Sequence, residues 1–165
     1  MDDKIYNVLF LCTGNSARSI MAEAILSVLG KGRFHAFSAG SHPSGQVQPM
    51  AKELAEAIGY DTSQLRSKNW NEFAGENAPE MDIVITVCDN AAGESCPLWL
   101  GQPALAHWGV PDPVAVTGDE DTRRRAYTAA FATLRRRIEL LLSLPLHSLD
   151  YLAAQAKLRD IGKVG

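Results

Sequence analysis

The feature that most constrains the fold is an apolar run near the N-terminus that stops at a tight turn and continues as an amphipathic helix. Residues 6–11 are rich in Val, Leu and Phe, as expected for a strand buried on both faces of a parallel sheet. Residues 13–16 have turn-forming side chains, and from Ala17 the apolar residues recur at helical spacing until Gly30. Because parallel strands need crossover connections, usually helices, this unit predicts an α/β protein.

The rest of the chain repeats the alternation of strands and helices. We expect strands at residues 34–39, 82–88 and 104–108, and helices at residues 50–58, 121–143 and 149–161, the last with Ser148 as its N-cap. This order predicts a flavodoxin-like three-layer fold with about four parallel strands and helices on both faces of the sheet. Residues 1–147 are predicted to form one domain, and residues 148–165 a C-terminal helical tail without an assigned function.

Composition narrows the classes of partner. The chain has 165 residues, of which 46% are hydrophobic, and its net charge of -3 offers no basic face to a nucleic acid. No apolar run approaches the roughly 18 residues that cross a bilayer, and the N-terminus lacks the pattern of a secretory signal. We expect a cytoplasmic protein without nucleic-acid or membrane partners. Two arginine runs, residues 123–125 and 135–137, are interpreted as solvated helix faces.

Three groups capable of chemistry, Cys12, Cys88 and Asp112, follow predicted strands. The carboxyl ends of parallel strands lie at the same edge of a sheet, which is where ligands bind in such folds. We therefore expect the three groups to share one site. The chain has three cysteines, an odd number that cannot close a disulfide framework, so in a reducing compartment they favour chemistry, metal binding or packing.

The loop after the first strand has the composition of an oxyanion-binding loop. A cysteine, five residues and an arginine stand between a strand and a helix N-terminus, where backbone N–H groups and the helix dipole favour an anion. The same field is expected to lower the pKa of Cys12 below the usual value of about 8.5, and Arg18 is able to bind two oxygens at once. The expected oxyanion-binding residues are Thr13, Gly14, Asn15, Ser16, Ala17 and Arg18. Glycine at position 14 permits a close backbone approach, and asparagine at 15 tolerates a left-handed conformation.

The loop and several later segments resemble the low-molecular-weight protein tyrosine phosphatases and, within that superfamily, the arsenate reductases that recycle through intramolecular disulfides. The markers are residues 12–19 leading into 21–24, residues 38–40, Val87-Cys88 with Cys96-Pro97, and His107-Trp108-Gly109 before Asp112-Pro113. This resemblance covers residues 1–143.

The resemblance implies an enzyme that reduces arsenate to arsenite. In the family that it resembles, the residue at Cys12 bonds arsenate, the residue at Cys88 attacks the sulfur of that adduct so that arsenite leaves, and the residue at Cys96 resolves the disulfide. Asp112 resembles the general acid. The implied reductant is a thioredoxin-like protein, whereas family variants use glutaredoxin with glutathione. No metal and no cofactor are expected.

The disulfide relay demands movement of the segment between the second and third cysteines. Eight positions of regular helix would separate the Cα atoms of Cys88 and Cys96 by about 12 Å, whereas a disulfide needs about 4.4–6.8 Å. The segment must therefore bend or unwind, and Gly93 among turn formers is suited to that. We predict that this stretch rearranges on oxidation.

Two other functions remain open. A low-molecular-weight phosphatase would use the same loop, but residues 114–116 lack the aromatic wall that tyrosine phosphatases of this fold usually place after the Asp-Pro pair. Ala17 also stands where many of these phosphatases have a cysteine, which favours Cys88 as the partner of Cys12. A non-catalytic arsenic or redox sensor would bind through the same thiols.

The resemblance also implies residues that support the loop, namely Asn15, Glu23 and Ser38. Ser19 is expected to support it as well, because its hydroxyl is able to donate a hydrogen bond to the loop or to the sulfur. In some related reductases the residues at Asn15, Glu23 and Ser38 help to bind a potassium ion. Here Lys68 stands where those enzymes supply an acidic ligand. We interpret its ammonium group as a replacement for the cation.

Overall fold

The computed structural model describes residues 4–87 and 102–164, and within these ranges four strands form one parallel sheet. The strands are β1 (Tyr6–Cys12), β2 (Phe34–Gly40), β3 (Ile83–Thr86) and β4 (Ala104–His107). The α-helices are α1 (Arg18–Leu29), α2 (Pro49–Ala57), α4 (Glu120–Leu142) and α5 (Tyr151–Ile161). The 3-10 helices are η1 (Thr62–Gln64), η2 (Trp70–Phe73), η3 (Pro113–Ala115) and η4 (Leu146–Ser148).

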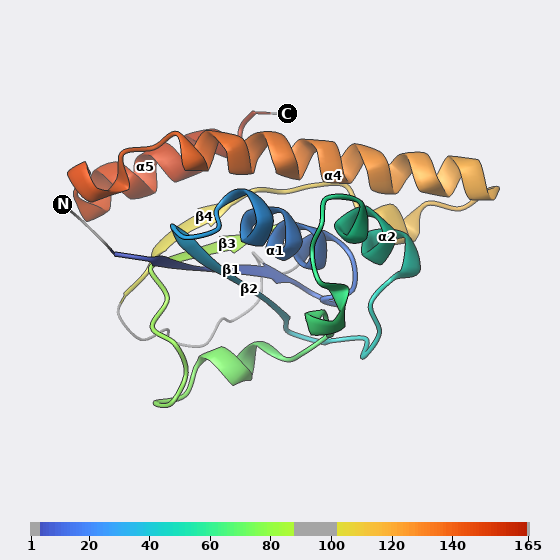
Figure 1. The fold of residues 1–165 in the computed structure, drawn as a ribbon, viewed down its shortest axis with the longest axis horizontal. Coiled ribbons are helices and arrows are strands. Elements are labelled where there is room, and N and C mark those ends of the chain that lie inside the picture. The colour runs from blue at the N-terminus through green and yellow to red at the C-terminus, as the bar shows by residue number, and fades with distance from the viewer. Residues whose placement is uncertain (1–3, 88–101, 165) are drawn as a thin grey trace.

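The sheet has the strand order β2-β1-β3-β4, with β1 paired to both β2 and β3 (Figure 1). All pairs are parallel, so every strand ends at the same rim. The predicted flavodoxin-like parallel sheet is confirmed. The third strand is shorter than predicted, because its ladder with β4 ends where Thr86 pairs with His107, while residue 88 lies outside the described ranges.

The two faces of the sheet are covered by unequal layers. Val8 and Phe10 belong to the core that includes the α-helices, whereas Leu9 and Leu11 pack with η2 on the opposite face. This alternation is the period-two geometry of a strand buried on both faces. In the described part of the chain the α-helices lie on one face of the sheet, and the helix on the second face is the short η2 (Figure 1).

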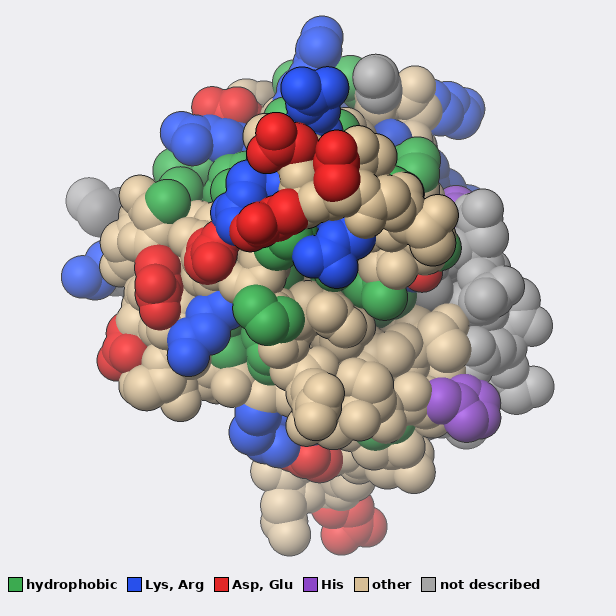
Figure 2. All heavy atoms as spheres, turned by 90° about the vertical axis from the view of Figure 1, so that its right-hand side faces the viewer, with side chains coloured by type: hydrophobic (Ala, Val, Ile, Leu, Met, Phe, Trp, Pro, Cys, Tyr) green, Lys and Arg blue, Asp and Glu red, His purple; other side chains and the backbone are tan. Residues whose placement is uncertain are grey.

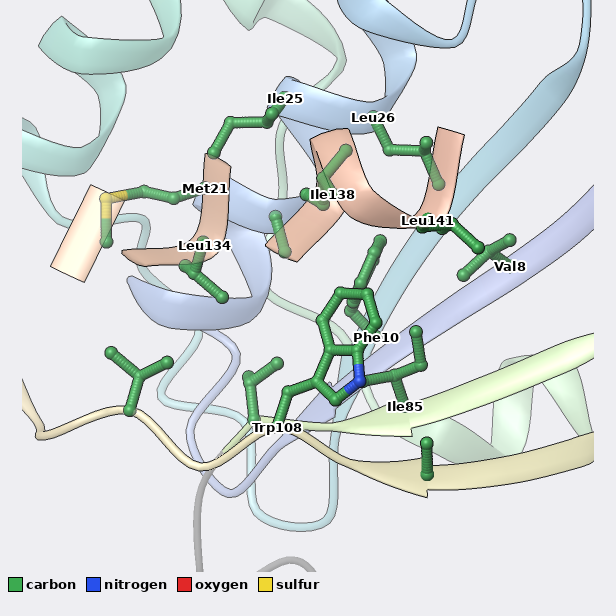
Figure 3. Close-up of a cluster of buried hydrophobic side chains, with 14 of the residues drawn as sticks. Val8, Phe10, Met21, Ile25, Leu26, Ile85, Trp108, Leu134, Ile138 and Leu141 are labelled. Carbon is green, nitrogen blue, oxygen red and sulfur yellow. The ribbon is translucent and has the colours of Figure 1, made fainter. Parts of the chain in front are cut away.

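The larger core fills the space between the sheet and the helices α1 and α4 (Figure 3). Trp108 is fully buried, and its ring tilts against Phe10 with the ring centroids 6.3 Å apart. Ile25 of α1 and Leu134 and Ile138 of α4 close over this pair and are also fully buried. Each side chain of this size contributes about 1.5–3 kcal/mol when it leaves water.

Side-chain caps mark the starts of the two C-terminal helices. Asp119 accepts a hydrogen bond from the N–H of Thr122 and begins α4. Asp150 accepts from the N–H of Ala153 at 2.7 Å and begins α5. The predicted N-cap at Ser148 is therefore wrong, because that residue ends the 3-10 helix η4 and the carboxylate two positions later takes the capping role.

Figure 2 looks onto the side of the molecule at which the strands end, and it shows acidic and basic side chains interspersed there. Of the two arginine runs, residues 123–125 and Arg135 and Arg136 are exposed, but Arg137 is only 5% exposed. The interpretation of both runs as solvated faces is thus wrong for Arg137. Across the ranges that the structure describes, no helix is long and apolar enough to traverse a bilayer.

Candidate oxyanion site

The loop between β1 and α1 connects a buried cysteine to the start of a helix. Cys12 is the last residue of β1 and is 4% exposed, and Arg18 is the first residue of α1. Between them Asn15 adopts a left-handed conformation with φ of 45°. The first turn of α1 contains no acidic side chain, so the positive end of its dipole is left for a bound anion.

One neighbouring segment, residues 41–48, binds the carbonyl groups of this loop. Backbone N–H groups donate from Ser41 to Cys12 O (3.3 Å), from His42 to Thr13 O (2.9 Å), from Ser44 to Gly14 O (3.0 Å) and from Gln48 to Ser16 O (2.9 Å). In a planar trans peptide the carbonyl and the following N–H point in opposite directions, and the described residues contain no cis peptide. The N–H groups of Thr13, Gly14, Asn15 and Ala17 therefore point away from residues 41–48. Such a row of N–H groups forms an anion-binding concavity.

The close packing behind the loop depends on a glycine at the end of β2. A Cβ atom on Gly40 would lie 2.4 Å from the carbonyl oxygen of Thr13 and 3.0 Å from the backbone nitrogen of Asn15. Only glycine allows this approach without displacement of the loop. The hydroxyl of Ser67 adds a further hydrogen bond to Gly14 O at 3.1 Å.

The arginine of the loop reaches the segment that follows β4. Nη1 of Arg18 donates to Val110 O at 2.9 Å, and Nη2 lies 3.6 Å from Oδ2 of Asp112. The other carboxylate oxygen of Asp112 accepts from the N–H of Val114 at 3.0 Å and caps η3. The structure thus places the candidate acid beside the candidate oxyanion-binding arginine, with side chains 40% and 13% exposed respectively.

A buried polar network lies behind the loop. The side-chain amide of Asn15 donates to the hydroxyls of Ser19 at 2.9 Å and Ser38 at 3.0 Å. Ser38 in turn donates to Oε1 of Glu23 at 2.6 Å. All four residues are buried, so each bond is protected from water and fixes the side chain of Asn15. The structure brings together all four residues that the sequence proposed as loop support.

Lys68 joins this network through its backbone and its side chain. Its N–H donates to Oδ1 of Asn15 at 2.9 Å. Its ammonium nitrogen lies 3.3 Å from Ser38 Oγ, 3.6 Å from Glu23 Oε1 and 3.0 Å from Arg66 O. Burial lowers the pKa of Lys68, and the carboxylate of Glu23 partly offsets that effect.

Comparison with known proteins identifies the family. The family described as low molecular weight phosphotyrosine protein phosphatase matches residues 7–154. The chain belongs to this family. The arsenate reductase of Bacillus subtilis (strain 168) is 34% identical over 123 residues, which are 74% of this chain and 84% of that relative.

Two further arsenate reductases extend the comparison. The glutaredoxin arsenate reductase of Synechocystis sp. is 35% identical over 106 residues, which are 64% of this chain and 77% of that relative. A solved structure described as an arsenate reductase in the phosphate binding state is 29% identical, with a TM-score of 0.68, and the match covers 84% of this chain and 98% of that one.

Two tyrosines near the site had no signal in the sequence. Tyr60 donates from its hydroxyl to Oε2 of Glu23 at 3.0 Å, and burial together with that carboxylate raises the pKa of Tyr60 to about 12. Tyr127 lies on α4, which the sequence predicts only as a helix over residues 121–143. It is buried, and burial followed by the negative charge of Asp112 raises its pKa.

Two of the three cysteines fall outside the described ranges. Cys88 and Cys96 lie between residues 87 and 102, so the structure places only Cys12 of the predicted relay. The same holds for the predicted rearrangement between Cys88 and Cys96. Within residues 4–87 and 102–164 no cluster of three or more His, Cys, Asp or Glu side chains is placed to hold a metal ion.

Proposed function

We propose that this protein is an enzyme that reduces arsenate to arsenite. The observation that carries the proposal is the loop of residues 12–18, in which four carbonyls are bound from behind and the opposed N–H groups face the other way. A buried thiol and an arginine stand at its two ends, and a tetrahedral oxyanion fits this arrangement. Relatives of 34–35% identity are named arsenate reductases, which supports arsenate as the oxyanion.

The first chemical step replaces one arsenate oxygen by sulfur. The thiolate of Cys12 attacks arsenic while Arg18 and the loop N–H groups hold the remaining oxygens. A sulfur–arsenic bond forms, an arsenic–oxygen bond breaks, and Asp112 donates a proton so that the oxygen leaves as water. The 3.6 Å separation between Arg18 and the Asp112 carboxylate brings the acid to the oxyanion-binding side chain, as this step requires.

The second step transfers two electrons to arsenic. The thiolate of Cys88 attacks the sulfur of Cys12, a disulfide forms, and the electron pair of the sulfur–arsenic bond stays on arsenic, which leaves as arsenite. The thiolate of Cys96 then attacks the sulfur of Cys88, and Cys12 is released as a thiol. An external dithiol reductant supplies two electrons to open the Cys88–Cys96 disulfide. We infer a thioredoxin-like donor, with glutaredoxin and glutathione as the alternative, and a cytoplasmic location where thiols stay reduced.

The alternative function, a tyrosine phosphatase, would need an aromatic wall beside Asp112 for the aryl ring of its substrate. Residues 114–116 do not supply one. Residues 114–116 are Val, Ala and Val, and Val114 is 44% exposed rather than packed as part of a pocket. Residues 114–116 themselves offer an aromatic substrate no stacking surface. A sensor would use the same loop and thiols but would not turn arsenate over.

Cysteine-to-serine variants test the proposal. We expect continuous arsenite release by the wild type with a thioredoxin system, and no release by Cys12→Ser. Cys96→Ser is expected to release arsenite once per molecule and to stop as the Cys12–Cys88 disulfide, visible by peptide mass spectrometry. Multiple turnover by Cys88→Ser with the same reductant would show that the relay is wrong. Binding of arsenate by the wild type without turnover would identify a sensor instead.

The same assays with glutathione and glutaredoxin decide the reductant. Hydrolysis of an aryl phosphate, measured in parallel, separates the two enzyme classes. Loss of arsenate turnover with retained phosphate hydrolysis in Cys88→Ser supports the reductase, because hydrolysis does not consume a second thiol.

A further inference from the structure

The residues after α4 cover the free edge of the sheet. β4 is the last strand in the sheet order, and α5 packs along it. The backbone N–H of Leu105 donates to Oε1 of Gln155 at 2.9 Å, and the carbonyl of Leu105 accepts from Nε of Arg159 at 3.2 Å. An edge strand otherwise leaves such groups unpaired, so these two side chains provide partners for both backbone groups of Leu105.

The end of α5 is fitted against the end of β4 that leads to the oxyanion site. The indole N–H of Trp108 donates at 2.8 Å to Leu158 O, which is a carbonyl of the last turn of α5. Beyond this turn, a Cβ atom on Gly162 would lie 2.2 Å from His107 O and 2.9 Å from Cδ1 of Trp108. The chain after α5 therefore touches the backbone at the point where β4 ends.

One buried guanidinium ties this C-terminal segment to the loop after β4. Arg137 of α4 is 5% exposed, its Nε donates to Val164 O at 2.9 Å, and its Nη1 donates to Gly109 O at 3.0 Å. Burial lowers the pKa of Arg137, because its charged guanidinium group is removed from water. Both carbonyls are needed to compensate this desolvation, so the guanidinium holds the two segments together.

The loop after β4 is the one that holds the arginine of the oxyanion loop. Gly109 is followed by Val110, whose N–H donates to Val87 O at 3.1 Å and whose carbonyl accepts from Arg18. Two positions later Asp112 lies beside the same arginine. A continuous set of contacts thus runs from Val164 through Arg137 and the Gly109-Val110 backbone to Arg18 and Asp112.

We propose that Arg137 and the C-terminal segment 158–164 are positioning elements that hold the loop of residues 109–112 and thereby orient Arg18 and Asp112 for loss of the arsenate oxygen. The family match ends at residue 154, so the contacts of Leu158, Gly162 and Val164 lie beyond it. The positioning role rests on the proposed function for its catalytic part only, because the structural link to residues 109–112 does not depend on the substrate.

Arg137→Met removes both hydrogen bonds while it keeps an unbranched apolar side chain in place of the arginine stem. Arg136→Met, on the exposed side of the same helix, is the matched control. The first readout is amide hydrogen exchange at Val110, whose N–H reports directly on the loop. We expect exchange there to rise about 10-fold or more in Arg137→Met through local opening, with β1 amides unchanged, and to stay at the wild-type rate in the control. Arg137→Lys, which keeps the charge and one possible donor contact, should restore part of the protection.

The second readout is a double-mutant cycle with Asp112→Asn in arsenate turnover. Displacement of reacting groups by about 1 Å costs on the order of 100-fold, so we expect Arg137→Met to lower kcat by about 10- to 100-fold with little change in KM. In the Asp112→Asn background the same change should have a clearly smaller effect on kcat, because one of the two groups that it positions is already disabled. A general loss of stability would lower both backgrounds equally.

Unchanged exchange at Val110 would overturn the proposal whether or not the protein reduces arsenate. Faster exchange with unchanged kcat, or with additive losses in the cycle, would overturn the catalytic part. If the wild type fails to turn arsenate over, the proposed function falls, and exchange at Val110 still decides whether Arg137 holds the loop. If Arg137→Met does not fold, Gly162→Ala tests the contact of the C-terminal segment with the end of β4, with the same expected rise in exchange at Val110.

Discussion

The ammonium nitrogen of Lys68 lies 3.6 Å from Oε1 of Glu23, and both side chains are 8% exposed. The pair is joined to the oxyanion loop because Ser38 bonds to Glu23 and Asn15 bonds to Ser38. A buried carboxylate in this position would carry an uncompensated charge if the lysine were absent. The lysine therefore supplies the ammonium group that pairs with Glu23 in the network that fixes Asn15.

Replacement of this cation by an apolar side chain should destabilise the fold. We expect Lys68→Met to lower the free energy of unfolding by about 3 kcal/mol, the low end for breaking a buried pair, because Ser38 and Tyr60 still donate to Glu23. Urea denaturation measures this change. Lys52→Met, on the exposed face of α2, is the control and should leave the midpoint unchanged. A loss in Lys68→Met as small as in the control would mean that the pair contributes little.

The position of the Lys68 ammonium group also predicts how arsenate turnover responds to potassium. Since the ammonium group already lies beside Glu23 and Ser38, wild-type arsenate turnover should be the same in sodium and potassium chloride. Lys68→Ala should be slower and should recover partly when potassium replaces sodium. A steep rise of wild-type activity with potassium would contradict the interpretation of Lys68 as the internal cation.

Gly40→Ala should disable the loop, because the new methyl group would lie 2.4 Å from Thr13 O and must push the loop away from β2. If the carbonyls of the loop are displaced, the loop N–H groups that face the oxyanion lose their alignment. We therefore expect arsenate turnover to fall on the order of 100-fold. Gly75→Ala is the control, since its added Cβ would meet nothing within 4 Å. Steady-state kinetics of the two variants measure the difference, and equal activities would refute the importance of the close approach.

Most of the structure that the sequence predicts correctly is local. The strand, loop and helix around Cys12 follow from apolar periodicity and turn chemistry within one short stretch, and the structure reproduces their order and nearly their bounds. The strand order also predicts that Asp112 shares a site with the Cys12 loop, and the structure places it beside Arg18 of that loop. The bond from Tyr60 to Glu23 cannot be read from spacing, because it depends on how separate elements pack.

Arg137 is the one missed residue whose position did contain a signal. It stands three positions after Leu134 and four before Leu141, which are both fully buried, so it lies on the buried stripe of α4. Its charge and its two arginine neighbours favoured a solvated interpretation. What permits its burial is a pair of carbonyls at Gly109 and Val164, and those are supplied only by the tertiary fold.

The hydroxyl of Tyr60 provides a pH-dependent test of the network. Its pKa is raised from 10.0 to about 12, first by burial and then by Glu23. A pKa that is higher in the folded state means that the neutral phenol stabilises the fold below pH 10, and that this contribution is lost as the pH rises through about 12. Near-ultraviolet titration of the wild type against Tyr60→Phe should show a phenolate appearing near pH 12. Glu23→Gln should lower that midpoint only part of the way, and a midpoint at the ordinary value in the wild type would refute the burial.

The indole of Trp108 provides the sharpest stability test of the C-terminal segment. Trp108→Phe keeps an aromatic ring against Phe10 but leaves Leu158 O without its buried donor, which should cost about 1–3 kcal/mol of unfolding free energy. Tyr151→Phe removes a part-buried hydrogen bond to Pro103 O from a residue that is 49% exposed, so water can replace it and it should cost much less. Chemical denaturation of both variants separates a bond made in the core from one made at the surface, because only the core bond leaves an unpaired acceptor. Equal losses in the two variants would mean that the end of α5 is not held to β4 through the indole.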